Sequence, residues 1–183
     1  MTIVGMCHYC GCRDIPLIKE FIAEHEAVTD LAGDAVRALE ADDRDRARTL
    51  VAEMTARPYT HWAGEEQGLF TEMGENEEYA AYIGALVREH RELAVFLASL
   101  DLDTAEQRSA FVHAVNELHE HIAKEEDGLF PASLTELTGD QWNRSMAAWR
   151  AVHAADPGGT ASDPGGTASG TDGPGSEGPA PTA

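Results

Sequence analysis

Basic residues and long apolar stretches are scarce in this chain of 183 residues. It has 13 lysines and arginines against 33 aspartates and glutamates, which gives a formal net charge of −20. Such a charge repels nucleic acid and anionic lipid and attracts cations. No run approaches the roughly 18 apolar residues of a membrane span, and the amino terminus lacks the apolar stretch of a secretion signal. We therefore expect a soluble, cytoplasmic protein without nucleic-acid or membrane partners.

Cysteine is also rare, and its three copies, Cys7, Cys10 and Cys12, lie close together. So tight a group excludes a disulfide framework. Together with His8, the Cys-x2-Cys-x-Cys pattern offers soft ligands for zinc or an iron–sulfur cluster, or a redox-active thiol group, and it is equally compatible with no role. No nucleophile elbow, phosphate loop or dinucleotide fingerprint is present, so none of these motifs assigns a catalytic function.

One pattern of ten residues, His-x3-Glu-Glu-x-Gly-Leu-Phe, occurs twice, at 61–70 and at 121–130. Residues four apart on a helix lie on one face, so each copy directs an imidazole and a carboxylate the same way. The two pairs are His61 with Glu65 and His121 with Glu125.

Apolar periodicity predicts four long amphipathic helices joined by short polar turns. Their expected spans are Asp14 to about Leu39, Asp45 to Phe70, Glu77 to Ser99, and Thr104 to about Leu129. We expect Asp14 to cap the first helix, with Pro16 in its first turn. Pro58 should bend the second helix without breaking it, and Pro131 should end the fourth.

A short fifth helix is expected from Gly139 to His153, and Thr104–Gln107 and Thr138–Gln141 resemble capping boxes. From about residue 155 the composition shifts to Gly, Pro, Ser, Thr and Ala, which cannot bury enough surface to fold. We therefore predict three regions: a Cys-rich arm (1–13), an all-α antiparallel up-down four-helix bundle with the short helix (14–154), and a disordered tail (155–183).

Each of the four long helices carries one histidine on its apolar stripe: His25, His61, His90 and His121. Consecutive histidines lie about equally far from the turn between them, so antiparallel packing should bring all four to one level, beside Glu65 and Glu125. A single such histidine is usually a hydrogen-bonded core residue, and a His-x3-Glu pair is usually a solvated pair. Burying all six groups in one layer without a metal would be costly, because buried carboxylates need neutralisation or a partner.

The ligand set indicates which metal is expected. Four imidazoles and two carboxylates are too many for one tetrahedral zinc and too rich in nitrogen for calcium or magnesium. Two iron ions bridged by Glu65 and Glu125, with the histidines as terminal ligands, would use every group. Manganese or a mixed metal pair fits the same ligands.

This order of residues, one His, then His-x3-Glu, then one His, then His-x3-Glu, resembles the haemerythrin-like, cation-binding HHE domain from about Asp14 to Pro131. The resemblance implies a four-helix bundle with an oxo- or hydroxo-bridged pair of non-haem irons. In that family dioxygen binds end-on at the iron with an open position.

The chain departs from the oxygen-carrying members, which have His-x3-His on the third helix. Here Ala94 follows His90 by four residues and Leu86 precedes it by four, so the fifth imidazole is missing. Glu126 is an alternative or an assistant to Glu125, whereas His113 and His119 point away and are expected to be surface or hydrogen-bonded residues. A site short of one imidazole favours redox reaction or sensing over oxygen carriage.

The leading hypothesis is a di-iron protein that binds or senses O2, peroxide or NO. An enzyme that decomposes peroxide at the same centre is the first alternative. Iron handling or storage is a second alternative, and an interaction module that works through the cysteine arm or the tail is a third.

Overall fold

The computed structural model describes residues 11–155 of the chain. Within it the backbone forms helices and no strand, which confirms the predicted all-α class. In chain order the elements are η1 (Cys12–Asp14), α1 (Ile18–Glu40), α2 (Arg44–Ala56), α3 (Pro58–Gln67), α4 (Leu69–Gly74), α5 (Glu77–Ser99), α6 (Ala105–Lys124), η2 (Glu125–Leu129), α7 (Phe130–Glu136) and α8 (Gly139–Ala155). Cys7, Cys10 and the tail at 156–183 lie outside the described residues.

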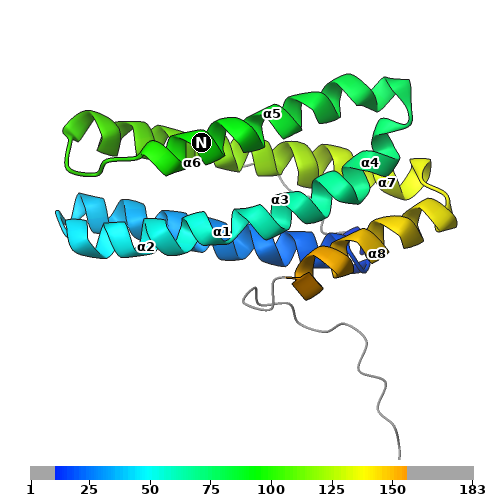
Figure 1. Cartoon of the computed structure of the whole chain (residues 1–183), viewed down its shortest axis with the longest axis horizontal. Helices are drawn as coiled ribbons and strands as arrows, with labels where there is room; N and C mark the ends of the chain where they lie inside the picture. The colour runs from blue at the N-terminus through cyan, green and yellow to red at the C-terminus, as the bar shows by residue number, and fades with distance from the viewer. Residues whose placement is uncertain (1–10, 156–183) are drawn as a thin grey trace, which may run out of the picture.

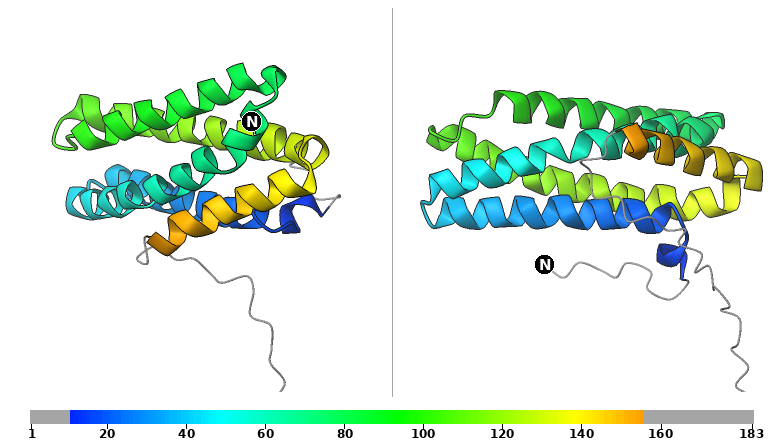
Figure 2. Two further views of the ribbon diagram at one scale, coloured as in Figure 1. Left: turned by 45° about the vertical axis from the view of Figure 1, so that its right-hand side comes forward. Right: turned by 60° about the horizontal axis from the view of Figure 1, so that its bottom comes forward.

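Helices α1, α2, α5 and α6 run along the long axis of the molecule, and α3 continues the course of α2 (Figure 1). Helix α1 packs against α2 and α6, while α5 packs against α2 and α6. Helix α8 packs on the outside of α3 and α4, and the turned views in Figure 2 show it running obliquely past them. These contacts enclose one interior. No helix in residues 11–155 has both the length and the apolar character required to cross a bilayer.

The first long helix begins later than predicted. Asp14 ends the short 3-10 turn η1, and α1 starts only at Ile18, after Leu17 with φ 78° and no side-chain cap. Ile15 is extended, at φ −70° and ψ 130°. A residue before proline is pushed out of the helical region, so Pro16 prevents a helix from running through Ile15.

The second predicted helix is divided at two places. Arg57 separates α2 from α3 but keeps helical angles, at φ −79° and ψ −43°, and Pro58 begins α3. The interruption is thus limited to one residue, next to the proline that cannot donate a backbone hydrogen bond. The break between α3 and α4 at Gly68, with φ −106° and ψ −100°, was not expected from the sequence.

The prediction that Pro131 ends the fourth helix is wrong. After α6 the chain forms the π-helical turn η2 and continues as α7, with Pro131 in its first turn. Proline is tolerated there because the first turn of a helix has backbone N–H groups without intrahelical partners. The π turn begins at Glu125, one of the predicted site residues.

The two predicted capping boxes form to different extents, and the predicted cap by Asp14 is wrong, because Leu17 without a side-chain cap precedes α1. Gln141 N donates to Thr138 Oγ1 at 3.4 Å and Thr138 N donates to Gln141 Oε1 at 3.1 Å, which completes the predicted capping box. At the other box, Gln107 N donates to Thr104 Oγ1 at 3.2 Å, but the buried Gln107 Oε1 has no hydrogen-bond partner. Only half of that box therefore forms.

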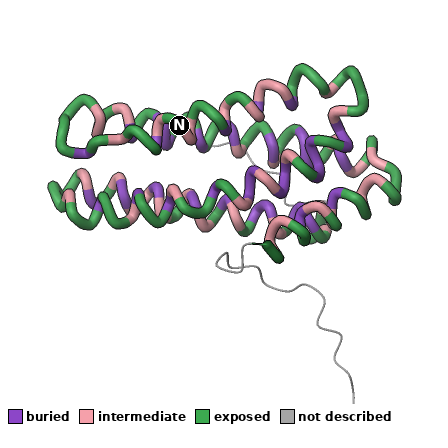
Figure 3. Tube along the Cα trace, in the orientation of Figure 1, coloured by how far each residue is buried: buried purple, intermediate pink, exposed green. Residues whose placement is uncertain are grey.

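The apolar core is divided into two clusters, which occupy successive stretches of α1 and α5. The first cluster includes Ile22 and Leu86, and the second includes Val28 and Leu97. Figure 3 shows the buried segments along the sides of the helices that face one another. The stretch of α1 between the two clusters contains the buried His25.

Candidate metal centre

One cluster of buried histidines and glutamates lies in the interior, with members from five elements. They are His25 of α1, His61 and Glu65 of α3, His90 of α5, His121 of α6 and Glu125 of η2, none more than 7% exposed. The structure thus brings together all six residues that the sequence singled out.

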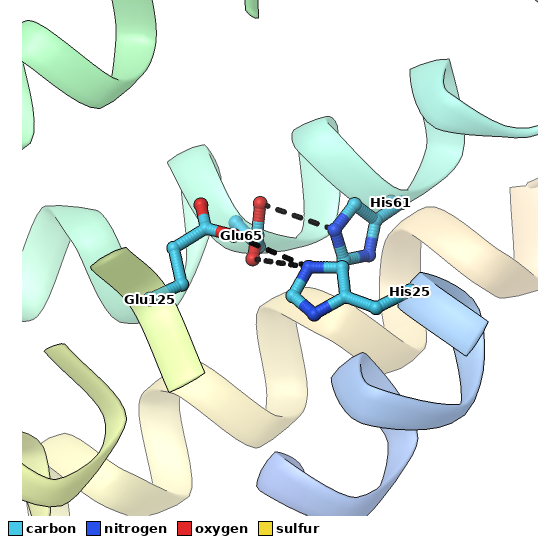
Figure 4. Close-up of side chains that lie close together, drawn as sticks. All are labelled: His25, His61, Glu65 and Glu125. Atoms are coloured by element: carbon cyan, nitrogen blue, oxygen red, sulfur yellow. Dashed lines mark ion pairs between the residues drawn. The ribbon is translucent and has the colours of Figure 1, made fainter. Parts of the chain in front are cut away.

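The possible ligand atoms of the cluster form two groups that share Glu125, with all atoms of a group within 4.8 Å of one another. The four-residue group is His25, His61, Glu65 and Glu125, and the three-residue group is His90, His121 and Glu125. Figure 4 shows the four-residue group, whose imidazoles and carboxylates are directed toward a common centre.

Glu65 belongs to the four-residue group and also approaches His90 of the three-residue group. Its Oε2 is 3.4 Å from His61 Nε2 and 3.6 Å from His90 Nε2, and its Oε1 is 3.9 Å from His25 Nε2. Neither oxygen has a hydrogen-bond partner, although the residue is fully buried. Burial and the nearby charge of Glu125 raise the pKa of Glu65 well above its usual value.

Glu125 of η2 also lies close to three of the four histidines. Its Oε2 is 3.2 Å from His25 Nε2, and its Oε1 is 3.0 Å from His121 Nε2 and 3.7 Å from His90 Nε2. Burial acts to raise the pKa of Glu125, but the three histidines outweigh it and hold that pKa well below the usual value. Glu65 and Glu125 therefore each lie close to histidines of both groups, as a bridging ligand would.

A second set of carboxylates holds the outer edges of the imidazoles. His61 Nδ1 donates to Glu24 Oε2 at 2.7 Å, and His121 Nδ1 donates to Glu89 Oε2 at 2.8 Å. Glu24 directly precedes His25 in α1, and Glu89 directly precedes His90 in α5. Each Glu–His dipeptide therefore supplies one imidazole to the cluster and one carboxylate that holds the imidazole of a neighbouring helix.

The remaining two imidazoles are held in the same way. His90 Nδ1 donates to Glu66 Oε1 at 2.9 Å, and His25 Nδ1 donates to Glu126 Oε1 at 3.0 Å. We call Glu24, Glu66, Glu89 and Glu126 the outer carboxylates. Because a carboxylate accepts at every Nδ1, each neutral ring carries its lone pair on Nε2, which is directed at the centre.

This arrangement leaves electron-pair donors facing one another. His25 Nε2 and all four oxygens of Glu65 and Glu125 are buried without a hydrogen-bond partner. Lone pairs packed so closely repel unless a proton or a metal cation lies between them. The cluster therefore fits a bound cation chemically, with neutral imidazoles and carboxylates of the kind that iron takes in proteins.

The pKa values of the histidines show how protons fill the site when no metal does. Burial lowers the pKa of His61 to about 4, although Glu24 opposes the shift. Burial also acts to lower the pKa of His25, but Glu125 and Glu126 outweigh it and raise that pKa to about 9. Without a cation, a proton on His25 thus offsets the carboxylate charge.

The family model of the hemerythrin HHE cation-binding domain matches residues 17–133. The chain belongs to this family. Searches of curated proteins and of solved structures found no significant match. Membership confirms the resemblance seen in the sequence and implies that the domain binds metal cations. The cation bound by hemerythrin HHE domains is typically iron.

Helix α8 lies beyond the part of the chain that matches the hemerythrin HHE domain, yet it contacts one of the outer carboxylates, Glu24. His153 Nε2 donates to Glu24 Oε1 at 2.7 Å, and His153 Nδ1 donates to the carbonyl of Trp149 at 2.8 Å. Gly64 of α3 permits this close packing, since a Cβ there would lie 2.9 Å from the Trp149 ring. No sequence pattern had indicated a role for His153.

Three of the outer carboxylates use one oxygen for an imidazole and the other for a basic side chain. The pairs are Glu24 with His153 at 2.7 Å, Glu89 with Lys124 at 2.6 Å and Glu126 with Arg13 at 2.9 Å. Each basic group compensates charge from outside and fixes the rotamer of its carboxylate, which in turn orients the imidazole.

Aromatic rings wall the cluster on both sides. Phe130 stacks on His25 with ring centroids 6.0 Å apart, and Phe21 meets His61 edge-on at 5.7 Å. Trp62 stacks on His90 at 5.0 Å. These rings exclude water and lower the local dielectric, which strengthens every electrostatic contact in the cluster.

The other histidines considered in the sequence, His113 and His119, lie outside the buried cluster. His113 is exposed and pairs with Glu117 at 3.4 Å, while His119 Nδ1 donates to the carbonyl of Val115 at 2.7 Å. Both are surface or hydrogen-bonded residues, as expected. Leu86 is fully buried in the apolar core, so no imidazole stands one turn before His90.

Of the cysteine cluster, only Cys12 belongs to the described residues, and it is half-buried in η1. The adjacent Arg13 contacts Glu126, which ties the end of the arm to an outer carboxylate. The possible metal or redox role of Cys7, Cys10 and Cys12 stays a prediction of the sequence.

Proposed function

We propose that this hemerythrin HHE protein holds two non-haem iron ions in the buried cluster. His25 and His61 would bind one ion, His90 and His121 the other. Glu65 and Glu125 would bridge them. The observation that supports this most directly is the set of buried Glu65, Glu125 and His25 atoms without hydrogen-bond partners.

The proposed centre requires the antiparallel up-down four-helix arrangement that the sequence predicts. In support, α1 contacts α2 and α6, α5 contacts α2 and α6, and short turns connect successive long helices. Such connections bring residues equally distant from a turn to the same level. The cytoplasmic location also stays a prediction of the sequence.

The protein's own part in the chemistry is to bind, orient and enclose. The outer carboxylates hold the Nδ1–H of each imidazole, so all four Nε2 atoms are presented as ligands. Phe21, Trp62 and Phe130 exclude bulk water from the cluster. A bound iron pair would supply redox chemistry and an open coordination position for a small molecule.

We propose that the protein binds or senses O2, peroxide or NO through this centre. The reason is that the chain offers six ligands rather than the seven implied by the fifth histidine of oxygen carriers, so a small external molecule has room to bind. An optical spectrum in air and after reduction tests the proposal. We expect a near-ultraviolet oxo-to-iron band in air that disappears on reduction, and a spectrum that changes when NO or hydrogen peroxide is added. Iron-loaded protein whose spectrum responds to none of O2, peroxide and NO would contradict the proposal.

An enzyme that decomposes peroxide is the second candidate, favoured by the same shortage of one imidazole. It predicts turnover of hydrogen peroxide that is lost in His61→Ala and kept in the control His119→Gln, whose histidine is exposed. Reversible oxygenation without peroxide turnover would favour the binding protein instead.

A further inference from the structure

A cavity of about 480 Å³ lies beside one half of the metal centre. It is lined by α5 and α6, together with Trp62 of α3. Its inner wall includes both His90 and His121, and Leu93, Phe96, Ala114 and Leu118 make it largely apolar. The volume falls within the range of small-molecule binding sites.

The cavity borders the three-residue group. Both histidines of that group, His90 and His121, line it, whereas neither His25 nor His61 of the four-residue group is among its lining residues. A small molecule in the cavity would therefore meet the ion that His90 and His121 would hold.

The four-residue group is covered from several sides. Phe130 stacks on His25, and Phe21 stacks on Phe130 with centroids 5.6 Å apart while it meets His61 edge-on. Helix α8 adds a further layer over α3 through His153. Aromatic rings and a packed helix thus shield the four-residue group on these sides, while the three-residue group borders the cavity.

The polar part of the cavity wall is mostly acidic. Glu89, Glu92, Glu117 and Glu120 line it, and Lys124, which pairs with Glu89, is the only lysine or arginine among its lining residues. Such a lining repels anions and leaves small uncharged molecules unaffected. The apolar inner wall then favours molecules that lose little hydration on entering.

We propose that this cavity is the entrance and binding site for a small uncharged ligand, which reaches the metal centre from the side of His90 and His121. The proposal rests on the proposed function, because it assumes that the cluster holds metal. Beyond the proposed function, it specifies that the external ligand binds beside His90 and His121 and that this ligand is uncharged.

Filling the cavity tests the route. Ala114 is buried against the cavity, and Val112 is exposed on the same helix and does not line it. In reduced, iron-loaded protein we expect Ala114→Phe to slow association of NO by about tenfold or more, because binding then requires α5 and α6 to separate. Val112→Phe should leave the rate unchanged. An unchanged NO rate in folded Ala114→Phe with full iron content overturns the proposal.

Reversing the charge of the lining tests the same route without altering the core. The side chains of Glu92 and Glu117 lie at the surface, so Glu92→Lys and Glu117→Lys preserve the fold even if Ala114→Phe does not. With both lysines present, azide association with the oxidised protein should accelerate by about tenfold at low salt, and added salt should abolish the gain. The NO rate should stay constant. Azide rates unaffected by the reversal overturn the proposal.

These outcomes differ from failure of the proposed function. A chain that takes up no iron, or whose iron binds neither NO nor azide, contradicts the metal centre itself. A chain that binds two irons and both probes, at rates insensitive to the cavity variants, keeps the centre and rejects only this entrance.

Discussion

His153 holds Glu24 across 129 positions of the sequence, by a hydrogen bond of 2.7 Å from Nε2 to Oε1. The other oxygen of Glu24 accepts from His61 at 2.7 Å. A helix outside the matched HHE domain therefore supports one of the proposed ligands through a single carboxylate.

The hydrogen bonds from His153 to Glu24 and from His61 to Glu24 predict that His153→Gln weakens metal binding at the four-residue group. Loss of an outer partner of a ligand typically costs about 10- to 100-fold in affinity, and His153 stands one step further out, so we expect about 3- to 10-fold. Metal titration against a competing chelator measures it. The matched control is His113→Gln, which removes an exposed histidine.

A double substitution separates positioning from general loss of stability. If His153 acts through Glu24, then His153→Gln should have no further effect on metal affinity in a Glu24→Ala background. An equal loss in both backgrounds, or an equal loss at both metal positions, would show that α8 contributes only stability.

The packing of α8 on α3 predicts a large cost for a single methyl group at Gly68. A Cβ there would lie 2.7 Å from the Gly64 carbonyl oxygen and 2.9 Å from that of Ser145, and backbone atoms cannot move aside cheaply. We expect Gly68→Ala to lower the free energy of unfolding by about 1–3 kcal/mol in urea denaturation.

Gly33 of α1 supplies the control for that experiment. Its added Cβ would meet only the flexible end of Arg37 at 3.3 Å. Gly33→Ala should therefore raise the free energy of unfolding by up to about 1 kcal/mol, through helix propensity. Similar effects of the two substitutions would contradict the close approach of α8.

The histidine pKa values predict how the stability of metal-free protein depends on pH. His61 has a folded pKa of about 4, below the usual 6.5, so its contribution is present above pH 6.5 and lost as the pH falls toward 4. His25 has a folded pKa of about 9, so its contribution is present below pH 6.5 and lost as the pH rises toward 9. The free energy of unfolding should therefore peak near pH 6.5.

Urea denaturation at pH 4.5, 6.5 and 9 measures this curve. Metal binding requires neutral imidazoles, so saturation with metal should remove the loss of stability between pH 6.5 and 9. A metal-free protein that is as stable at pH 9 as at pH 6.5 would show that His25 does not hold the proton assigned to it.

Much of the cluster follows from local sequence rules. The helical period places His25 and His90 inward, and the spacing of four places Glu65 with His61 and Glu125 with His121. The order of the helices then brings them together. Helix ends were less predictable where proline acts on its neighbours, as at Ile15, or where a π turn shifts the register, as at Glu125.

The outer contacts could not be read in the same way. Glu66 follows Glu65 by one position, so its side chain points toward a neighbouring helix. Only the packed structure shows that this side chain accepts a hydrogen bond from His90. His153 reaches Glu24 because Gly64 lets α8 approach, a relationship without any fixed spacing. The cavity beside His121 depends on the distance between α5 and α6, which no sequence period sets.

We propose above that the cluster holds two metal ions, one held by His25 and His61 and the other by His90 and His121. Iron content per chain, measured after anaerobic loading and removal of loose metal, tests it directly. We expect two irons in the unaltered protein, one in His61→Ala and one in His121→Ala. We expect none in the Glu65→Ala and Glu125→Ala double variant, and two in His113→Gln. Folded, unaltered protein that retains no iron, or His61→Ala and His121→Ala variants that retain both, would contradict it.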